Sequence, residues 1–125
     1  MPPTVLIVDD SESNRYLLTL LLGEAGLHVL PVASGREALT LAEKYPPALV
    51  LLDLQMPELD GFETAHLLQA LPLMHGVPIV AVTATVSSST RERVRLAGFA
   101  GYFAKPINPD TFLQESLRYI NPPSP

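Results

Sequence analysis

Side chains that can perform chemistry stand at the ends of four apolar segments of the sequence. Asp9 and Asp10 follow the first such segment, Asp53 the third, Thr83 the fourth and Lys105 the last. Three neighbouring carboxylates raise one another's pKa, and a hard divalent cation bound by oxygen removes that repulsion. Oxygen ligands favour Mg²⁺, which also accepts phosphate oxygens. An aspartate beside Mg²⁺, with lysine and threonine donors, suits phosphoryl transfer in which the carboxylate is the nucleophile.

Each of these residues also has an ordinary structural explanation. A strand-end aspartate such as Asp10 is most often a helix cap or part of a solvated turn. Thr83 is a β-branched residue that suits a strand, and Lys105 alone is best explained as a solvated charge. Two acids, a third acid, a hydroxyl and an ammonium at corresponding strand ends are harder to attribute to turn chemistry alone. The combination therefore favours a functional site.

The elements that would carry these residues alternate between strand and helix. Five short apolar segments, at residues 5–8, 28–32, 48–52, 78–82 and 101–104, are separated by helical patterns. Segments one, three and four are apolar on both faces, which is typical of parallel strands covered by helices on each side. The second contains His28 and Pro31, so we expect it at an edge. Right-handed connections then predict a doubly wound, three-layer α/β domain, with ligands at the carboxyl ends of its strands.

Capping signals mark where the helices begin. The expected first residues or caps are Ser11, Ser34, Asp60, Ser87 and Asn108. The first helix should end before Gly26 and the fourth at Gly98, because glycine adopts left-handed backbone angles freely. The expected apolar face of the first helix is Leu17, Leu18, Leu21 and Ala25, and that of the fifth is Leu113, Leu117 and Ile120.

The composition restricts the function. The 125 residues fit one domain, which we place at 1–125 with a core at about 4–120 and a Pro-rich tail at 121–125. A net charge of −5 argues against direct nucleic-acid binding. There is no cysteine, and we find neither a signal peptide nor an apolar stretch that reads as a membrane span, so we expect a cytoplasmic protein.

At this point the sequence resembles the receiver domains of two-component response regulators, over residues 4–120. The motifs that carry the resemblance are VLIVDD at 5–10, LLDLQMPELDG at 51–61, AVTA at 81–84 and GYFAKPI at 101–107. The resemblance implies a flavodoxin-like fold with strand order 2-1-3-4-5 and five helices. It also implies a cis peptide bond between Lys105 and Pro106.

The resemblance further assigns roles to individual residues. Asp9 and Asp10 match the acid pair that holds Mg²⁺, and the main-chain carbonyl of Gln55 would be a further ligand. Asp53 matches the phosphoacceptor. Thr83 matches the hydroxyl that turns toward the phosphoryl group, Tyr102 the switch aromatic, and Lys105 the lysine that pairs with phosphate oxygens. The chain would be a signalling switch rather than a metabolic enzyme, although it would assist its own phosphorylation and dephosphorylation.

The resemblance also implies partners. The phosphoryl donor would be a sensor histidine kinase or a histidine phosphotransfer protein, and the signal would leave through the face of helix four, strand five and helix five. Arginines 91, 93, 95 and 118 lie on or near that face, either as a partner site or as solvated charges. The sequence looks closest to single-domain receivers and to receivers of hybrid kinases. It leaves the downstream partner and a homodimer open.

Three other functions are less well supported. A phosphatase that works through an aspartyl phosphate would need a second acid two residues after its nucleophile, where Gln55 stands. A flavodoxin-like nucleotide binder would need a Gly- or Ser/Thr-rich phosphate loop after the first strand. Asp9 and Asp10 stand there instead, and they would repel a phosphate that lacks a metal ion. A binding module that no longer needs phosphorylation would have no use for three intact acids.

Overall fold

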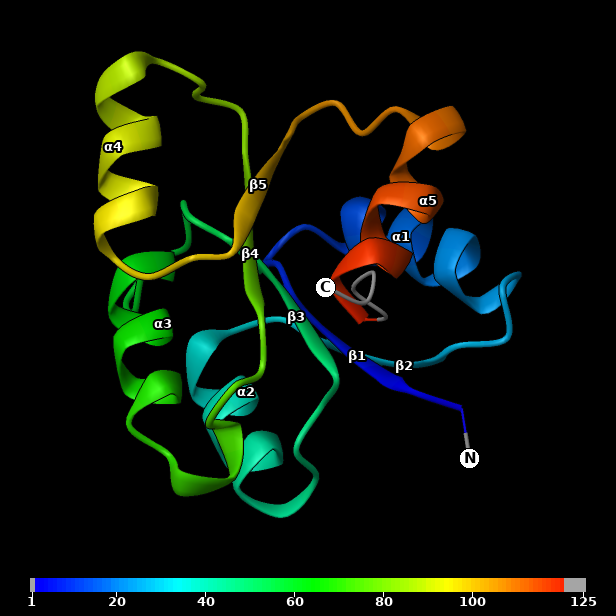
Figure 1. Ribbon diagram of the computed structural model, residues 1–125, viewed down its shortest axis with the longest axis horizontal. Helices are drawn as coiled ribbons and strands as arrows, with labels where there is room; N and C mark the ends of the chain where they lie inside the picture. The colour runs from blue at the N-terminus through cyan, green and yellow to red at the C-terminus, as the bar shows by residue number, and fades with distance from the viewer. Residues whose placement is uncertain (1, 121–125) are drawn as a thin grey trace, which may run out of the picture.

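The computed structural model describes residues 2–120 and shows a five-stranded parallel sheet between two layers of helices (Figure 1). The strands are β1 (Thr4–Val8), β2 (His28–Val32), β3 (Leu49–Asp53), β4 (Ile79–Thr83) and β5 (Gly101–Ala104). The helices are α1 (Glu12–Gly23), α2 (Gly35–Lys44), α3 (Gly61–Gln69), α4 (Ser88–Leu96) and α5 (Pro109–Ile120). A short 3₁₀ helix, η1 (Pro72–Met74), precedes β4.

The strand order is 2-1-3-4-5, as expected, and all four pairings are parallel. The β2 strand lies at one edge, which is where Pro31 can be accommodated without removing an interior ladder bond. The doubly wound fold class is therefore confirmed. The Pro-rich tail at 121–125 lies outside the described residues.

The helices begin at the capping residues that the sequence indicated. The side chains of Ser11, Ser34, Asp60 and Ser87 each accept a hydrogen bond from a backbone N–H three residues later. The Asn108 side chain accepts from the Asp110 backbone N–H at 3.0 Å, at the start of α5. Gly26 and Gly98 both have positive φ angles, of 82° and 86°, just beyond the ends of α1 and α4.

Two apolar cores lie on opposite faces of the sheet (Figure 1). One core packs α2, α3 and α4 against alternate strand residues such as Leu6, Val50 and Leu52. The other packs α1 and α5 against the intervening residues, among them Ile7 and Leu51. This alternation is the period-two pattern of a strand that is buried on both sides.

The buried faces of the outer helices differ in part from expectation. In α1, Leu18 and Leu22 are buried, whereas Ala25 lies past the helix end and is exposed. In α5, the fully buried side chains are Phe112 and Ser116, and the predicted leucines are only partly buried. The helices have the predicted positions, and Leu18, Leu21, Leu113 and Ile120 do pack in this core, but the most deeply buried residues of α5 lie one position before the predicted leucines.

Helix α4 is attached differently from the others. Val94 is its one buried side chain. Two contacts to α3 support it: the Arg93 guanidinium lies 4.1 Å from the centroid of the Phe62 ring, and the Gln69 side chain donates to the Ala97 carbonyl at 3.2 Å. The attachment of α4 therefore depends as much on side chains of α3 as on the core. No helix within residues 2–120 is long and apolar enough to cross a bilayer.

Candidate functional site

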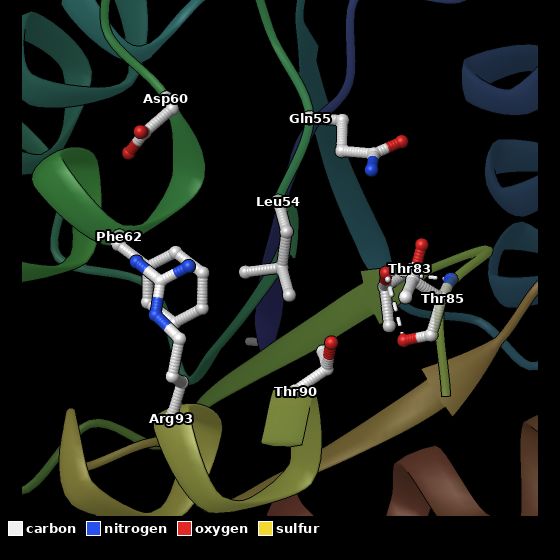
Figure 2. A pocket seen from close by; sticks show the side chains of 8 residues that line it. All are labelled: Leu54, Gln55, Asp60, Phe62, Thr83, Thr85, Thr90 and Arg93. Atoms are coloured by element: carbon white, nitrogen blue, oxygen red, sulfur yellow. Dashed lines mark hydrogen bonds between the residues drawn. The ribbon is translucent and has the colours of Figure 1, made fainter. Parts of the chain in front are cut away.

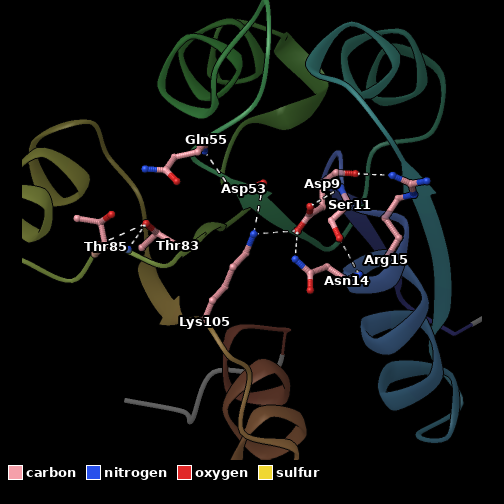
Figure 3. Close-up of polar contacts among 9 residues, drawn as sticks. All are labelled: Asp9, Ser11, Asn14, Arg15, Asp53, Gln55, Thr83, Thr85 and Lys105. Carbon is pink, nitrogen blue, oxygen red and sulfur yellow. Dashed lines mark hydrogen bonds and ion pairs between the residues drawn. The ribbon is translucent and has the colours of Figure 1, made fainter.

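The five predicted site residues at the strand ends share one edge of the sheet, and Figure 3 shows Asp9, Asp53, Thr83 and Lys105. Asp9 and Asp10 directly follow β1, Asp53 ends β3, Thr83 ends β4, and Lys105 directly follows β5. Since all five strands are parallel, their carboxyl ends share an edge, and the sequence spacing brings these residues together.

Asp9, Asp10 and Asp53 form a compact acid cluster. Each offers a carboxylate oxygen, and the three oxygens lie within 4.8 Å of one another. Asp9 and Asp53 are only 2% and 4% exposed, whereas Asp10 is open to solvent. Two buried carboxylates beside an exposed third make an oxygen-only donor set that is open on one side. This donor set fits Mg²⁺, which keeps some of its water and takes few protein carboxylates.

Lys105 neutralises part of this charge. Its Nζ atom lies 3.4 Å from Oδ2 of Asp9 and 3.4 Å from Oδ2 of Asp53. The lysine side chain is 22% exposed, so these ion pairs are shielded from solvent more than surface pairs are. The Lys105–Pro106 peptide bond is cis, as the resemblance implied.

The environment of Asp53 alters its acidity. Burial raises the pKa of its carboxyl from the usual 3.8 to about 6, because desolvation disfavours the charged form. A hydrogen bond from the Gln55 backbone N–H, at 3.1 Å, lowers the pKa, as does the Lys105 ammonium, while the Asp9 charge raises it. With a pKa of about 6, Asp53 is mostly ionised at neutral pH, but its charged form is less favoured than that of an exposed aspartate.

The residues that fix Asp9 were not identified from the sequence. The Ser11 backbone N–H donates to Oδ1 of Asp9 at 2.8 Å, and the Asn14 side chain donates to Oδ2 at 3.4 Å. The Arg15 guanidinium donates to the Asp9 main-chain carbonyl at 2.8 Å. Their position in the sequence could have identified them, because the first turn of a helix that follows a strand-end acid faces that acid.

Gly61 was also missed. A Cβ atom added there would lie 2.4 Å from the Asp53 carbonyl oxygen and 2.6 Å from Cα of Leu54. The Gly61 backbone N–H donates to the Leu54 carbonyl at 3.1 Å, which draws the start of α3 onto the end of β3. The signal was an Asp-Gly pair seven residues after Asp53, where a glycine permits close backbone approach.

Thr83 and Tyr102 lie on neighbouring strands near this edge. The Thr83 hydroxyl accepts from the Thr85 backbone N–H at 3.0 Å and donates to the Thr85 carbonyl at 3.3 Å (Figure 3). Tyr102 is partly buried against the core on the α4 side of the sheet, and the Arg91 guanidinium lies 5.6 Å from its ring centroid. The structure thus places Tyr102 between the sheet and α4, without direct contact to the acid cluster.

A cavity of about 170 Å³ adjoins the site, between Thr83 and α4 (Figure 2). It is lined by Leu54, Gln55, Asp60, Phe62, Thr83, Thr85, Thr90 and Arg93. Among the predicted site residues it therefore touches only Gln55 and Thr83. The Gln55 side chain is exposed.

Comparisons with known proteins agree with this geometry. The family model of the response regulator receiver domain matches residues 5–116. The polar-differentiation response regulator DivK of Brucella anthropi is 35% identical over 120 residues, which is 96% of this chain and 98% of that protein.

Two solved structures are similar over nearly the whole chain. The chemotaxis protein CheY4 of Vibrio cholerae superposes with a TM-score of 0.91 at 33% identity, covering 95% of this chain and 99% of that one. The receiver domain of the sensor histidine kinase PA1611 of Pseudomonas aeruginosa gives 0.87 at 30% identity, covering 96% and 98%, and holds a magnesium ion coordinated in its active-site cleft. By its fold, its motifs and these relatives, the chain belongs to the family of receiver domains of two-component response regulators.

Proposed function

We propose that this receiver domain takes a phosphoryl group from a phosphohistidine onto Asp53 in a Mg²⁺-dependent reaction. The observation that supports this most strongly is the convergence of three carboxylates and the Lys105 ammonium at the carboxyl edge of the sheet. Asp53 is the central acid of the three, because it ends a strand that is flanked on both sides by other strands. The same chain would assist loss of the phosphoryl group, with water as the acceptor.

Asp9, Asp10, Asp53 and the main-chain carbonyl of Gln55 would hold the metal ion. When bound, Mg²⁺ would neutralise negative charge that would otherwise repel the incoming phosphoryl group. The hydrogen bonds from Ser11 and Asn14 hold both oxygens of Asp9 in place, so this carboxylate is oriented before any ion arrives.

Lys105 and Thr83 would bind the oxygens of the phosphoryl group. The Lys105 ammonium already bridges Asp9 and Asp53, and it can move the short distance to a phosphate oxygen as the Asp53 charge is consumed. The Thr83 hydroxyl engages the Thr85 backbone, so it must leave these two hydrogen bonds in order to donate to the phosphoryl group. That exchange is the first step of the proposed switch.

Tyr102 would transmit the movement of Thr83 to the surface of the domain. Movement of Thr83 toward the phosphoryl group opens space on the α4 side, into which the Tyr102 ring can turn. The ring would then leave the Arg91 guanidinium that lies over it. The face of α4, β5 and α5 would change shape and charge, and a protein partner would bind there. We place this exchange in the cytoplasm, with a sensor histidine kinase or a histidine phosphotransfer protein as the donor.

The central test is the mass of the protein after exposure to acetyl phosphate and Mg²⁺. Asp53 should gain about 80 Da, the mass of one phosphoryl group, and tandem mass spectrometry after borohydride reduction should locate it. Asp53→Asn should remain unlabelled, because an amide is not a nucleophile. Asp110→Asn, an exposed carboxylate in the first turn of α5, is the matched control and should label normally. Full labelling of Asp53→Asn would place the acceptor elsewhere.

A further inference from the structure

The cavity beside Thr83 is not part of the acid cluster, yet it opens next to it. Of the residues that line it, Leu54 directly follows Asp53, Gln55 is two residues after it, and Thr83 follows Val82, the partner of Asp53 on the neighbouring strand. Its volume is about 170 Å³, several times what a single water molecule needs. A small organic group that accompanies a phosphoryl group to Asp53 therefore has room here.

One cation in the cavity wall, Arg93, takes no part in an ion pair among residues 2–120. Arg95 on the same helix, by contrast, pairs with Glu92. The Arg93 guanidinium is instead stacked on the Phe62 ring, at 4.1 Å from its centroid (Figure 2). Stacking on an aromatic face fixes a guanidinium while leaving its N–H donors free at the edges.

The other walls suit a small group with one charged and one apolar end. Leu54 and Phe62 provide apolar surface, and Thr85 and Thr90 provide polar groups. The Asp60 carboxylate also lines the cavity, and one of its oxygens accepts from the Glu63 backbone N–H at 2.9 Å as the cap of α3. Arg93 is the one cationic side chain among the lining residues. An anionic ligand would thus meet Arg93 as its principal charge partner.

We propose that this cavity binds the leaving group of small acyl phosphates, with Arg93 as the charge partner of the departing carboxylate. The proposal rests on the proposed function of Asp53 as acceptor. It makes Arg93 a specificity-determining residue for direct phosphorylation by small molecules, independent of a histidine donor.

The reaction balances without any further reactant. The Asp53 carboxylate attacks phosphorus, an Oδ–P bond forms, and the bond between phosphorus and the acyl oxygen breaks. The leaving carboxylate keeps the electron pair of that bond and departs with one negative charge, with no proton transferred. Charge grows on the leaving oxygen in the transition state, and a fixed cation stabilises it. Phosphoramidate differs because ammonia leaves as a neutral molecule, for which Arg93 offers nothing.

The experiment compares these two donors. Rates of Asp53 phosphorylation by acetyl phosphate and by phosphoramidate are measured with Mg²⁺ for the wild type, Arg93→Gln and Arg93→Lys. We expect Arg93→Gln to slow the acetyl phosphate reaction about fivefold to tenfold and the phosphoramidate reaction less than about twofold. Arg93→Lys should recover part of the acetyl phosphate rate, since it keeps the charge but loses the planar fork.

Two controls separate this effect from a long-range electrostatic effect of removing one positive charge. Arg91→Gln removes an equal charge from the same helix, next to Tyr102 rather than in the cavity, and should leave the ratio of the two rates unchanged. Repeating the measurements at about 0.5 M salt screens long-range attraction of the doubly charged acetyl phosphate, and the effect of Arg93→Gln on the ratio should persist.

A second measurement tests binding in the cavity without any transfer of a phosphoryl group. Phosphonoacetate carries a carboxylate where acetyl phosphate carries its acyl group, and methylphosphonate lacks it. In amide NMR spectra, phosphonoacetate should shift the Thr85 and Thr90 signals in the wild type but not in Arg93→Gln, and methylphosphonate should shift them in neither.

Equal slowing of both donors by Arg93→Gln, or an equal change of the ratio by Arg91→Gln, would overturn the assignment of the cavity. Failure of both donors to label wild-type Asp53 would instead overturn the proposed function.

Discussion

The Lys105 ammonium lies at the same distance, 3.4 Å, from the carboxylates of Asp53 and Asp9. One cation from the end of β5 thus bridges acids from the ends of β3 and β1. Its positive charge would attract the oxygens of a phosphoryl group on Asp53, and it would repel a metal ion bound to the same carboxylates. At the proposed site, Lys105 would therefore both prepare Asp53 for a phosphoryl group and compete with a divalent cation.

These two roles predict opposite effects of one substitution. Lys105→Met should tighten Mg²⁺ binding by about threefold to tenfold, because a like charge near the ion is removed. It should slow phosphorylation of Asp53 by about tenfold to a hundredfold, because a donor to the transferring oxygens is lost. Calorimetric Mg²⁺ titration and phosphorylation rates measure the two effects. Lys44→Met, at an exposed position in the last turn of α2, should change neither. Weaker Mg²⁺ binding by Lys105→Met would contradict the competition.

The raised pKa of Asp53 predicts how the metal-free protein responds to pH. Its folded pKa is about 6, above its usual value of 3.8, so between these values the folded state binds a proton that the unfolded state does not. The contribution of Asp53 to the free energy of unfolding therefore falls as pH rises from about 4 to 7. Asp53→Asn should be more stable than the wild type by about 1–3 kcal/mol at pH 7.5, and this difference should shrink toward pH 4.

Urea unfolding of both proteins at several pH values, with a chelator present, measures this difference. Asp110→Asn is the control and should show no such trend, because its carboxyl is exposed. A difference between wild type and Asp53→Asn that stays constant from pH 4 to 7.5 would show that Asp53 does not carry the destabilising charge.

The close approach at Gly61 predicts a large effect of one methyl group. Gly61→Ala places a Cβ atom against the Asp53 carbonyl and Leu54, both backbone atoms that cannot move independently. We expect a loss of about 2–4 kcal/mol in the free energy of unfolding and slower phosphorylation, since the end of β3 must shift. Gly23→Ala, in α1 with no atom within 4 Å of the new Cβ, is the matched control and should be neutral or stabilising by up to about 1 kcal/mol. Equal stability of the two variants would show that the loop adjusts freely.

The acid cluster predicts that Mg²⁺ stabilises the fold. At a concentration ten times its dissociation constant, the ion should raise the free energy of unfolding by about 1.4 kcal/mol. Asp10→Ala should abolish most of this gain while leaving the metal-free protein as stable as the wild type or more so, because it removes a repelling charge. Thermal unfolding with and without Mg²⁺ measures both effects. An undiminished Mg²⁺ effect in Asp10→Ala would exclude Asp10 as a ligand.

The hydrogen bonds of Thr83 predict that phosphorylation and signalling can be separated. Thr83→Ala should still accept a phosphoryl group at Asp53, but Tyr102 should no longer respond. In the wild type, the phosphate mimic beryllofluoride should shift the ring signals of Tyr102 and increase partner affinity by about 1–3 kcal/mol. In Thr83→Ala both changes should fall to a small fraction. Equal responses of the wild type and Thr83→Ala to beryllofluoride would show that Thr83 does not couple Asp53 to Tyr102.

Much of the fold could be predicted because its signals are local. Caps such as Ser34 and Asp60 act over three residues, and the segments of β1, β3 and β4 are apolar on both faces. The edge position of β2 followed from His28 and Pro31 within its sequence. The rotation of α5 could not be predicted in the same way, since burial of Ser116 depends on which face of the helix the Phe112 ring occupies, and that is set by the neighbouring helix and strand.

The candidate site divides in a similar way. The acids and Lys105 could be placed because parallel strands bring their ends to one edge. The residues that hold Asp9 could not, because a backbone N–H such as that of Ser11 has no side-chain signature. The Arg93–Phe62 contact joins two helices that are distant in sequence, and only the packing of α4 on α3 reveals it.

The single buried residue of α4 has a consequence for how such a domain diverges. Replacing the outward residues of this helix removes little apolar packing, because Val94 alone is inserted into the core. The acids of the proposed site, by contrast, follow or end interior strands of the sheet. Two copies of this sequence could therefore drift apart on α4 and acquire different partners, while the acid cluster at the edge of the sheet stays unchanged.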